Sequence, residues 1–325
     1  MLAEIALYIL IHMALGLAVH EFGHYAFGTL TGYGFLSFRL GPLVWFKEDG
    51  QVHFKFSKNN MLAGQCLMEP TKNPKEFKFV LYNLGGVLFN LFAVVIFLII
   101  PGFHMFIVQG IVMNLCLAAA NLVPMKRVIP NDGANVLEAL KSKDAARGLY
   151  MMLYTNNETA KGKRFRDFDN EMFNVEEGAD LSNYFVIYLV ILEAARLEDL
   201  GKYNESFDLY LKIDLQKLPS YYATMIKADL MYHYICHKAD FNKAREIFKH
   251  KGLQKLLKAG LPQLDMILSA YHFLVDGNMH EGKKMLDKAR KGTENLPNKG
   301  QRLAISDHIK KLESLLQEKG IDYAA

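Results

Sequence analysis

The chain opens with an apolar stretch, residues 2–30, which is longer than the roughly 20 residues that a helix needs to cross a membrane. Its residues are nearly all Ala, Ile, Leu, Val, Phe, Met and Gly, yet residues 20–24 read HEFGH. An ionisable side chain inside such a segment is costly and usually serves a function. Three such side chains side by side therefore constrain this chain more than any other feature of its sequence.

The spacing of the two histidines predicts a metal site. Positions four apart lie on one face of a helix, so His20 and His24 can place two imidazole nitrogens on one zinc ion, with Glu21 beside them. Zinc takes neutral imidazole ligands, and a catalytic zinc site keeps one position open for water. Glu21 is then placed to accept a proton from that water. The competing interpretation is a histidine pair that only caps the helix at the membrane surface.

A cleavable signal peptide is the other structure that an N-terminal apolar run can represent. No basic segment precedes this run, Glu4 stands where a lysine is expected, and the apolar residues continue past His24. The sequence therefore predicts a retained membrane span.

Two further apolar runs, residues 77–101 and 103–123, predict a second and a third span joined by a tight turn. In the second span Gly86 and Asn90 lie four apart. A small residue lets two helices approach closely, and a buried Asn in lipid needs a polar partner. This face is therefore predicted to pack against the first span.

The third span ends in NLVP, where Asn121 and Pro124 are expected to break the helix beside a polar cavity. The sequence NDG follows, and its Asp132 can return to the zinc as a third, oxygen ligand. Asn-Asp-Gly is also an ordinary turn sequence. Glu138 and Asp144 are nearby alternatives for the third ligand.

Between the first two spans, residues 33–56 predict a β-hairpin with its turn at Asp49-Gly50, because apolar and polar residues alternate after that turn. Such a hairpin can offer a strand edge to an extended substrate near the histidines, or it can be an interfacial packing element with no substrate role.

The basic residues are distributed unevenly around the three spans. Lysine and arginine are plentiful between the first and second spans and after the third, whereas residues 101–104 contain neither. By the positive-inside rule the N-terminus is outside, and everything after about residue 125 is cytosolic. A net charge of +4 suggests no nucleic-acid partner. Three scattered cysteines, Cys66, Cys116 and Cys236, include no C-x-x-C pair and argue against a disulfide framework or a cysteine zinc site.

The C-terminal half is predicted to consist of paired amphipathic helices. GKYNESFDLY, ADFNKAREIF and GNMHEGKKML, which begin at Gly201, Ala239 and Gly277, superimpose at a constant offset of 38 residues, the difference between successive start positions. Each has a small residue at its sixth position. These segments resemble the tetratricopeptide repeat, in which small residues let two antiparallel helices pack. The resemblance implies a concave surface for a cytosolic protein or peptide, and the bland alternative is a helical cap that only stabilises the membrane core.

The N-terminal motifs, taken in order, resemble the site-2 protease family of intramembrane zinc metalloproteases: HEFGH in one span, G-x-x-x-N in the next, and NLVP followed by NDG. The resemblance covers residues 1–140. It implies that His20, His24 and Asp132 bind Zn²⁺, and that Glu21 is the catalytic acid/base. Family members usually bring the aspartate closer behind N-x-x-P, as Leu-Asp-Gly, whereas residues 125–131 make a longer link here.

The expected fold is mainly α: a three-span metalloprotease core with a small β-hairpin at 1–140, a linker at 141–182, and a cytosolic helical repeat domain at 183–325. The expected function is cleavage of peptide bonds in or near transmembrane segments of regulatory proteins or signal-peptide remnants, in the lipid bilayer of a bacterial cell membrane. The alternative is a membrane-anchored repeat adaptor with a structural or vestigial metal site, but an adaptor has no need of Glu21. A metal transporter is disfavoured, since three spans offer no further intramembrane carboxylates as a path.

Overall fold

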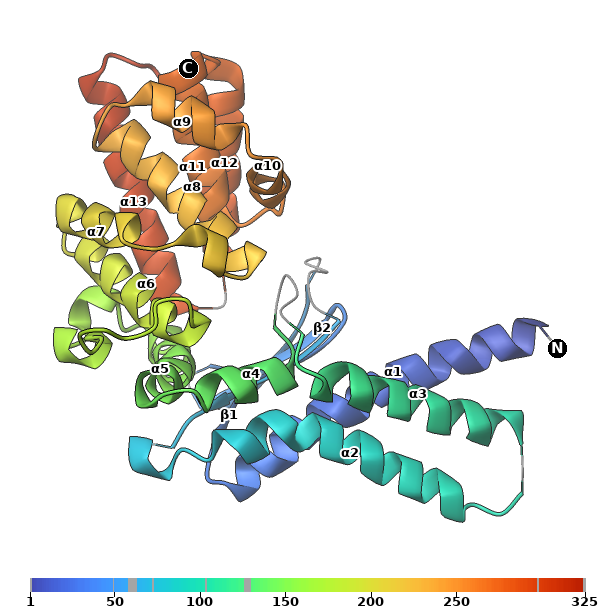
Figure 1. Cartoon of the computed structure of the whole chain (residues 1–325). Helices are drawn as coiled ribbons and strands as arrows, with labels where there is room; N and C mark the ends of the chain where they lie inside the picture. Colours follow the sequence, from blue (N-terminus) through green and yellow to red (C-terminus); the bar gives the residue numbers. More distant parts are fainter. Residues whose placement is uncertain are drawn as a thin grey trace. The chain divides into compact units, whose positions relative to one another are not determined.

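The computed structural model of this 325-residue chain describes residues 2–48, 50–57, 63–71, 73–102, 104–125, 130–296 and 298–323. The described residues form thirteen α-helices and a four-stranded antiparallel sheet (Figure 1). They divide into two compact units, unit 1 (1–157) and unit 2 (158–325), with the boundary inside helix α5, Lys143–Ala160.

Some predicted features lie outside the described residues. They are Asp49 of the predicted hairpin turn, Phe103 at the start of the third apolar run, residues 126–129 of the link before Asp132, and the basic residues Lys58 and Lys72.

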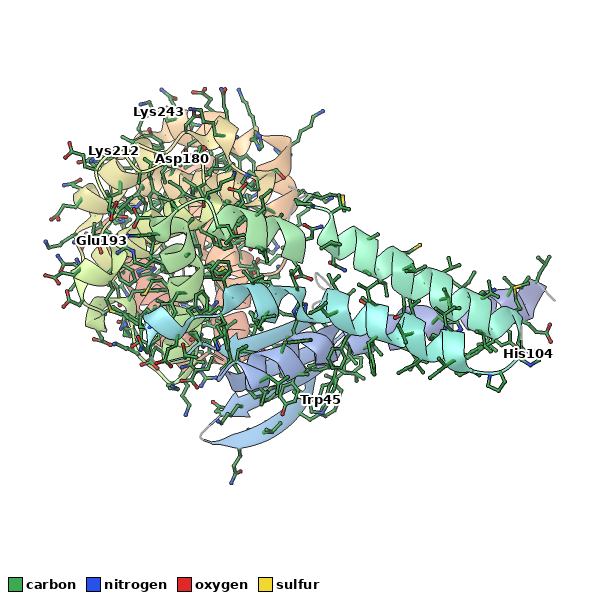
Figure 2. The ribbon with its side chains drawn as sticks, turned by 60° about the horizontal axis from the view of Figure 1, so that its bottom comes forward. Trp45, His104, Asp180, Glu193, Lys212 and Lys243 are labelled. Atoms are coloured by element: carbon green, nitrogen blue, oxygen red, sulfur yellow. The ribbon has the colours of Figure 1, made fainter. Side chains whose placement is uncertain are left out.

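Three helices of unit 1 have the length and composition to span a membrane: α1 (Leu2–Leu30), α2 (Phe79–Ile99) and α3 (Met105–Leu122). They confirm the three long apolar helices that the sequence predicts. The side chains along α2 and α3 are almost all carbon, and His104 lies at the connection between these two helices (Figure 2). The connection turns at Gly102, whose φ of +98° lies in the left-handed region.

Helices α1 and α2 pack backbone against backbone. A Cβ added at Gly23 of α1 would lie 2.3 Å from the carbonyl oxygen of Gly85 on α2, so both positions require glycine. Helix α1 ends at Leu30, and the amide of Tyr33 donates to the carbonyl of Gly28 across the left-handed Gly32. This turn leads the chain directly into the sheet.

Residues 33–56, predicted as one hairpin, form three strands, and a fourth strand follows them. The strands of the sheet are β1 (Gly34–Leu40), β2 (Leu43–Glu48), β3 (Gln51–Phe56) and β4 (Gly64–Glu69), in the antiparallel order β3-β2-β1-β4. In the hairpin Leu43 pairs with Phe56 and Glu48 with Gln51. The edges of the sheet are therefore β3, with Val52, Phe54 and Phe56 exposed, and β4, which packs against α1.

The small core of unit 1 joins the sheet to the helices. Tyr33, Cys66, Met68, Tyr82 and Leu153 are buried together, and the Tyr82 hydroxyl donates to the carbonyl of Cys66 at 2.8 Å. This core fixes β4 next to α2 and to the end of α1 that carries the histidines.

After α3 the chain forms α4 (Asp132–Ala139) and α5, and then two short 3₁₀ helices, Phe165–Asp167 and Asn170–Phe173. The segment predicted as a linker, 141–182, therefore contains α5 as regular structure. The structure brings the first part of α5 into the core of unit 1 through Leu153.

Unit 2 is entirely helical in its described residues. Its α-helices are α6 (Tyr184–Asp199), α7 (Tyr203–Leu211), α8 (Ser220–Cys236), α9 (Phe241–Phe248), α10 (Lys251–Leu257), α11 (Pro262–Tyr271), α12 (Met279–Glu294) and α13 (Lys299–Glu318). A 3₁₀ turn at Leu215–Lys217 precedes α8, and a π-helical turn at His272–Asp276 follows α11.

Three helices of unit 2 begin at a constant interval. They are α7, α9 and α12, whose first residues are 38 apart, since 241 − 203 and 279 − 241 both equal 38. Each follows a residue in the left-handed region, Gly201, Ala239 or Gly277. The small residues at the sixth position of each predicted segment, Ser206, Ala244 and Gly282, are all buried.

Candidate metal centre

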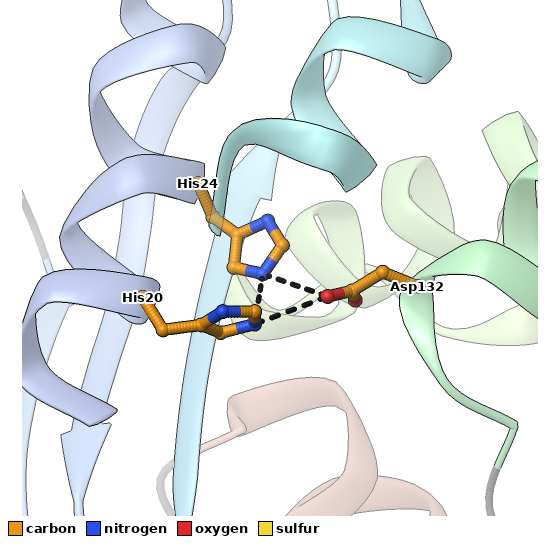
Figure 3. A group of neighbouring side chains, drawn as sticks. All are labelled: His20, His24 and Asp132. Atoms are coloured by element: carbon orange, nitrogen blue, oxygen red, sulfur yellow. Dashed lines mark hydrogen bonds and ion pairs between the residues drawn. The ribbon is translucent and has the colours of Figure 1, made fainter. Parts of the chain in front are cut away.

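Two histidines of α1 and an aspartate of α4 point toward one another (Figure 3). The Nε2 atoms of His20 and His24 are 3.2 Å apart, and Oδ2 of Asp132 lies 3.1 Å from the first and 3.4 Å from the second. Both histidines are buried. The helical period predicted that His20 and His24 lie together. The tertiary structure adds the carboxylate of Asp132, which is 112 residues further along the chain than His20.

Each imidazole is fixed by a bond at its other nitrogen. Nδ1 of His24 lies 2.8 Å from the backbone carbonyl oxygen of Tyr82, which can only accept, so this nitrogen carries the proton. Nδ1 of His20 lies 2.8 Å from Oδ1 of Asn90. These are the outer contacts that orient metal-binding histidines.

The direction of the His20–Asn90 bond follows from a chain of amides. Nδ2 of Asn114 donates to the carbonyl of Gly110, so its Oδ1 is free to accept. Nδ2 of Asn90 donates to that Oδ1 at 2.9 Å and to the carbonyl of Gly16 at 3.0 Å. Oδ1 of Asn90 must then accept from Nδ1 of His20. Asn90, which was predicted to need a polar partner, therefore has three: His20, Asn114 and the carbonyl of Gly16.

In their neutral form both imidazoles therefore direct an unprotonated Nε2 at the Asp132 carboxylate. Three lone-pair atoms then meet, which is unfavourable unless a proton or a metal cation lies among them. Their separations of 3.1 to 3.4 Å match the edge of a tetrahedron with metal–ligand bonds of about 2.1 Å, which is about 3.4 Å. His20, His24 and Asp132 can thus hold a metal ion.

The carboxyl group of Asp132 is ionised at neutral pH. Burial acts to raise its pKa, but without a metal ion an Nε2–H of the neighbouring His20 or His24 donates to the carboxylate, which outweighs burial and lowers the pKa to about 2. A negative oxygen is the form that a metal ion takes as a ligand.

Asp132 reaches the histidines because Asn131 fastens the start of α4 to the end of α3. Nδ2 of Asn131 donates to the carbonyls of Ala120 and Val123, both at 2.7 Å. Its Oδ1 accepts from the amides of Met125 and Ala134, the latter bond being the N-cap of α4. Sequence reasoning missed this residue, although an Asn directly before a helix start is the available signal.

Glu21 lies beside the ligands and against strand β4. It is buried, and a Cβ added at Gly64 would lie 2.5 Å from its Oε1. The backbone of Cys66, also on β4, hydrogen-bonds to the same carboxylate. The edge strand thus runs past the carboxylate that the sequence marks as the proton acceptor.

Gly86 provides the space for the His20 ring. A Cβ added there would lie 2.5 to 2.6 Å from three atoms of the imidazole. The sequence predicted close packing of α2 on α1, and the structure shows that the imidazole itself fills this gap.

The other predicted positions lie apart from the histidines. Nδ2 of Asn121 donates to the carbonyl of Leu117 in its own helix, and Pro124 follows the end of α3, where the helix was expected to break. Glu138 pairs with Lys141 and Asp144 with Arg147, so neither alternative third ligand joins the group around His20 and His24.

Comparisons with protein families, with curated proteins and with solved structures found no match for this chain.

Proposed function

We propose that this chain is an intramembrane zinc endopeptidase of the site-2 protease type. The observation that carries the proposal is the convergence of the Nε2 atoms of His20 and His24 with a carboxylate oxygen of Asp132. Both histidines and Glu21 lie on α1, a helix long and apolar enough to span a membrane. This donor set of two nitrogens and one oxygen is one that zinc takes in hydrolases, with a fourth position left for water.

The residues divide the chemistry among them. Zinc, when bound by His20, His24 and Asp132, supplies polarisation of a carbonyl and a water of lowered pKa. The backbone carbonyl of Tyr82 and the side chain of Asn90 hold the Nδ1 protons of the two imidazoles, so that both Nε2 atoms are aimed at the ligand position. Glu21 accepts the proton of the attacking water on its carboxylate and delivers it to the leaving amine nitrogen. Burial of Glu21 limits competing water around this transfer.

Strand β4 is the substrate-binding edge in this proposal. It is an edge strand, and it places Gly64 and Cys66 against Glu21. An extended substrate added to that edge would receive backbone hydrogen bonds and pass the catalytic carboxylate. The exposed Val52, Phe54 and Phe56 on the opposite edge fit the second predicted role, an interfacial anchor in the membrane surface.

The proposed membrane topology rests on the distribution of charge. The connection between α2 and α3 has no Lys or Arg at residues 101–104, while basic residues follow α1 and α3. The N-terminus is then outside a bacterial cell membrane, the metal centre lies toward the cytoplasmic end of α1, and unit 2 is cytosolic.

Unit 2 is proposed as a repeat domain that binds a cytosolic protein or the cytosolic tail of the substrate. The constant interval of 38 residues between α7, α9 and α12 supports this proposal. Repeated helix pairs stack into a surface that recognises peptides.

Zinc content is the first test. Detergent-purified wild type is compared with His24→Ala, Asp132→Ala and Glu21→Gln. We expect about one zinc per chain in the wild type and in Glu21→Gln, and loss of zinc in the other two variants, because only they remove a ligand. A wild-type protein that binds no zinc would favour the membrane-anchored adaptor. Loss in His24→Ala alone would retain the enzyme and reassign the third ligand.

Cleavage is the second test, using single-span membrane substrates in detergent or vesicles. A helical peptide bond is shielded by its own hydrogen bonds, so the substrate must unwind locally. Substrates with Gly, Pro, Asn or Ser near the scissile bond are therefore expected to be cut, and their Leu-substituted versions spared. Glu21→Gln should bind zinc and cut neither. Equal cleavage of the Leu-substituted substrates would contradict the requirement for unwinding.

A further inference from the structure

Unit 2 contains a cavity that the proposed protease chemistry does not use. Its volume is about 230 Å³, and its walls come from α6, α8, α11 and α13. Ile191, Met225, Met266 and Ile305 form much of the apolar wall. A second, separate cavity of about 250 Å³ lies along α13 and shares Glu198, Tyr232 and His308 with the first.

The polar part of the wall contains three carboxylates, Glu198, Asp199 and Asp229, which differ in their hydrogen-bond and ion-pair partners. Glu198 accepts from Nε2 of His233 at 2.8 Å and from the hydroxyl of Ser206 at 3.0 Å. Asp199 pairs with the guanidinium groups of Arg164 and Arg166.

Asp229 differs from those two carboxylates. It hydrogen-bonds to the hydroxyl of Tyr210, and no basic side chain among the described residues pairs with it. Burial, with repulsion from Glu198, raises the pKa of Asp229 well above its usual range. Unit 2 therefore holds a carboxyl group without the imidazole or guanidinium partners that its two neighbours have.

A second unsatisfied group faces the same space. Nε2 of His308 is buried and has no hydrogen-bond partner among the described residues, although His308 lines both cavities. Burial also lowers the pKa of His308, so this imidazole is neutral at physiological pH. A buried polar atom without a partner is unusual in a native protein and calls for a bound group.

Aromatic rings complete the wall. Tyr210 and Tyr232 line the first cavity, and Tyr203 and Tyr232 line the second. Aromatic faces combined with carboxylates are how proteins recognise organic cations. Arg164 does not attract an anion here, because its guanidinium already pairs with Asp199 and Asp307.

We propose that this cavity binds an organic cation, an alkylammonium or guanidinium group, through Asp229 and Glu198 with Tyr232 beside it and His308 as a further polar contact. The group can belong to a free small molecule or to a Lys or Arg side chain of a bound peptide. The cavity is too small for a drug-sized ligand, whose pockets begin at roughly 300 Å³, and suits a single such group. This inference stands independently of the proposed peptidase activity.

Isothermal titration of the full-length chain in detergent tests the proposal, in a Glu21→Gln background that excludes self-cleavage. The probes are n-butylammonium and ethylguanidinium, with their neutral counterparts n-butanol and ethylurea as controls. A capped Gly-Arg-Gly peptide distinguishes the two sources of the cation. We expect saturable heat for at least one cationic probe and none for its neutral counterpart, with a proton released from Asp229 as the cation binds. Repeating the titration in buffers of different ionisation enthalpy measures that proton.

Three variants locate the site. Asp229→Asn keeps the shape and the Tyr210 partner but removes the charge, and is expected to weaken binding about tenfold or more. Ala304→Phe leaves both carboxylates and fills the cavity. Asp208→Asn makes the same charge change at an exposed position of α7 and should bind as the wild type does.

Circular dichroism tests whether each variant is folded. If Asp229→Asn does not fold, the titration of Ala304→Phe decides whether the cation binds in this cavity. Tighter binding of the peptide than of the free cations would assign the site to a peptide side chain, and the reverse to a free ligand. The proposal is overturned if neither cation nor peptide binds, if the neutral counterparts bind equally well, or if binding survives Ala304→Phe.

Discussion

The His20 ring and the α-carbon of Gly86 are in such close contact that a Cβ at residue 86 would lie 2.5 Å from Cε1 of His20. This contact places α2 directly behind a metal-ligand candidate, so the geometry of the centre depends on the absence of a side chain at one position of a neighbouring helix. A shift of α2 away from α1 would make room for a side chain at residue 86. Such a shift would break the close backbone packing of Gly23 against Gly85, so we expect the imidazole to move instead.

Gly86→Ala is therefore expected to turn His20 away from the metal position. Metal affinity should fall by about 10- to 100-fold, the range found when the surroundings of a ligand are disturbed. Metal titration with a competing chelator measures the change. The matched control is Gly28→Ala on α1, where the added Cβ would come no closer than 3.0 Å to the flexible end of Met68 and 3.3 Å to the Tyr82 ring. Equal affinity in both variants would show that the His20 ring is not confined by Gly86.

Asn90→Leu removes the acceptor that holds the Nδ1 proton of His20 and thereby directs its Nε2 at the metal position. Metal affinity is expected to drop by about 10- to 100-fold, because the imidazole loses both its orientation and its tautomer. Asn121→Leu provides the control, since it makes the same substitution in another long apolar helix, at a side chain that bonds to its own helix. If the two variants lose metal alike, the loss reflects helix packing and not the His20–Asn90 bond.

Asn131→Ala should loosen Asp132 without altering the histidines. Four hydrogen bonds join Asn131 to the end of α3 and the start of α4, and losing an N-cap alone costs about 1 kcal/mol. We expect weaker metal binding and faster hydrogen exchange in α4, measured by mass spectrometry. Asn131→Asp keeps the two acceptor bonds and loses the two donor bonds, so its effect should be intermediate. Unchanged exchange in α4 would show that other contacts position Asp132.

Ala239→Gly is expected to stabilise unit 2. Ala239 has a φ of +52°, whereas the corresponding positions before α7 and α12 are glycines. Glycine adopts this conformation without strain, so Ala239→Gly should raise the free energy of unfolding by about 1 kcal/mol. Gly201→Ala should lower it by a similar amount. Hydrogen exchange in α8 and α9 measures the stability of unit 2. Tryptophan fluorescence would not, because the only tryptophan, Trp45, lies in the sheet of unit 1. Slower exchange in Gly201→Ala would contradict the assignment of a left-handed position.

Mild acid is expected to destabilise unit 2 through His237. Burial, with repulsion from His233, lowers the pKa of His237 from 6.5 to about 4. The unfolded chain then binds more protons than the folded chain between these two values, so the stability contributed by His237 falls as pH decreases through that window. Because His237 is partly exposed, we expect a loss of only about 1 kcal/mol by pH 5.

His237→Phe isolates this effect, because phenylalanine can keep the stacking on Tyr203 but cannot take a proton. Thermal unfolding followed by circular dichroism at pH 7 and pH 5 gives the two stabilities. The wild type should lose more than the variant over this interval. Parallel losses would assign the acid sensitivity to other groups, such as His308, whose pKa is also lowered by burial.

The local parts of the fold follow directly from sequence patterns. The three long helices of unit 1 follow from long, predominantly apolar runs, because a helix satisfies its own backbone hydrogen bonds in an apolar environment. The β2–β3 hairpin is likewise carried by its alternating residues. Strand β4 was not predicted, since GQCLME shows no clear alternation of apolar and polar residues, and it is held as a strand by its pairing with β1.

The candidate site divides in the same way. The sequence by itself determined that His20, Glu21 and His24 share one helix, and that two of them share one face, because the helical period is a property of neighbouring residues. Only the tertiary structure decided that Asp132 completes the group, that Asn90 orients His20, and that Asn131 holds Asp132 in place. These contacts join residues from 70 to 112 positions apart, or the ends of two different helices, so they depend on the path of the chain and on helix packing that no local pattern encodes.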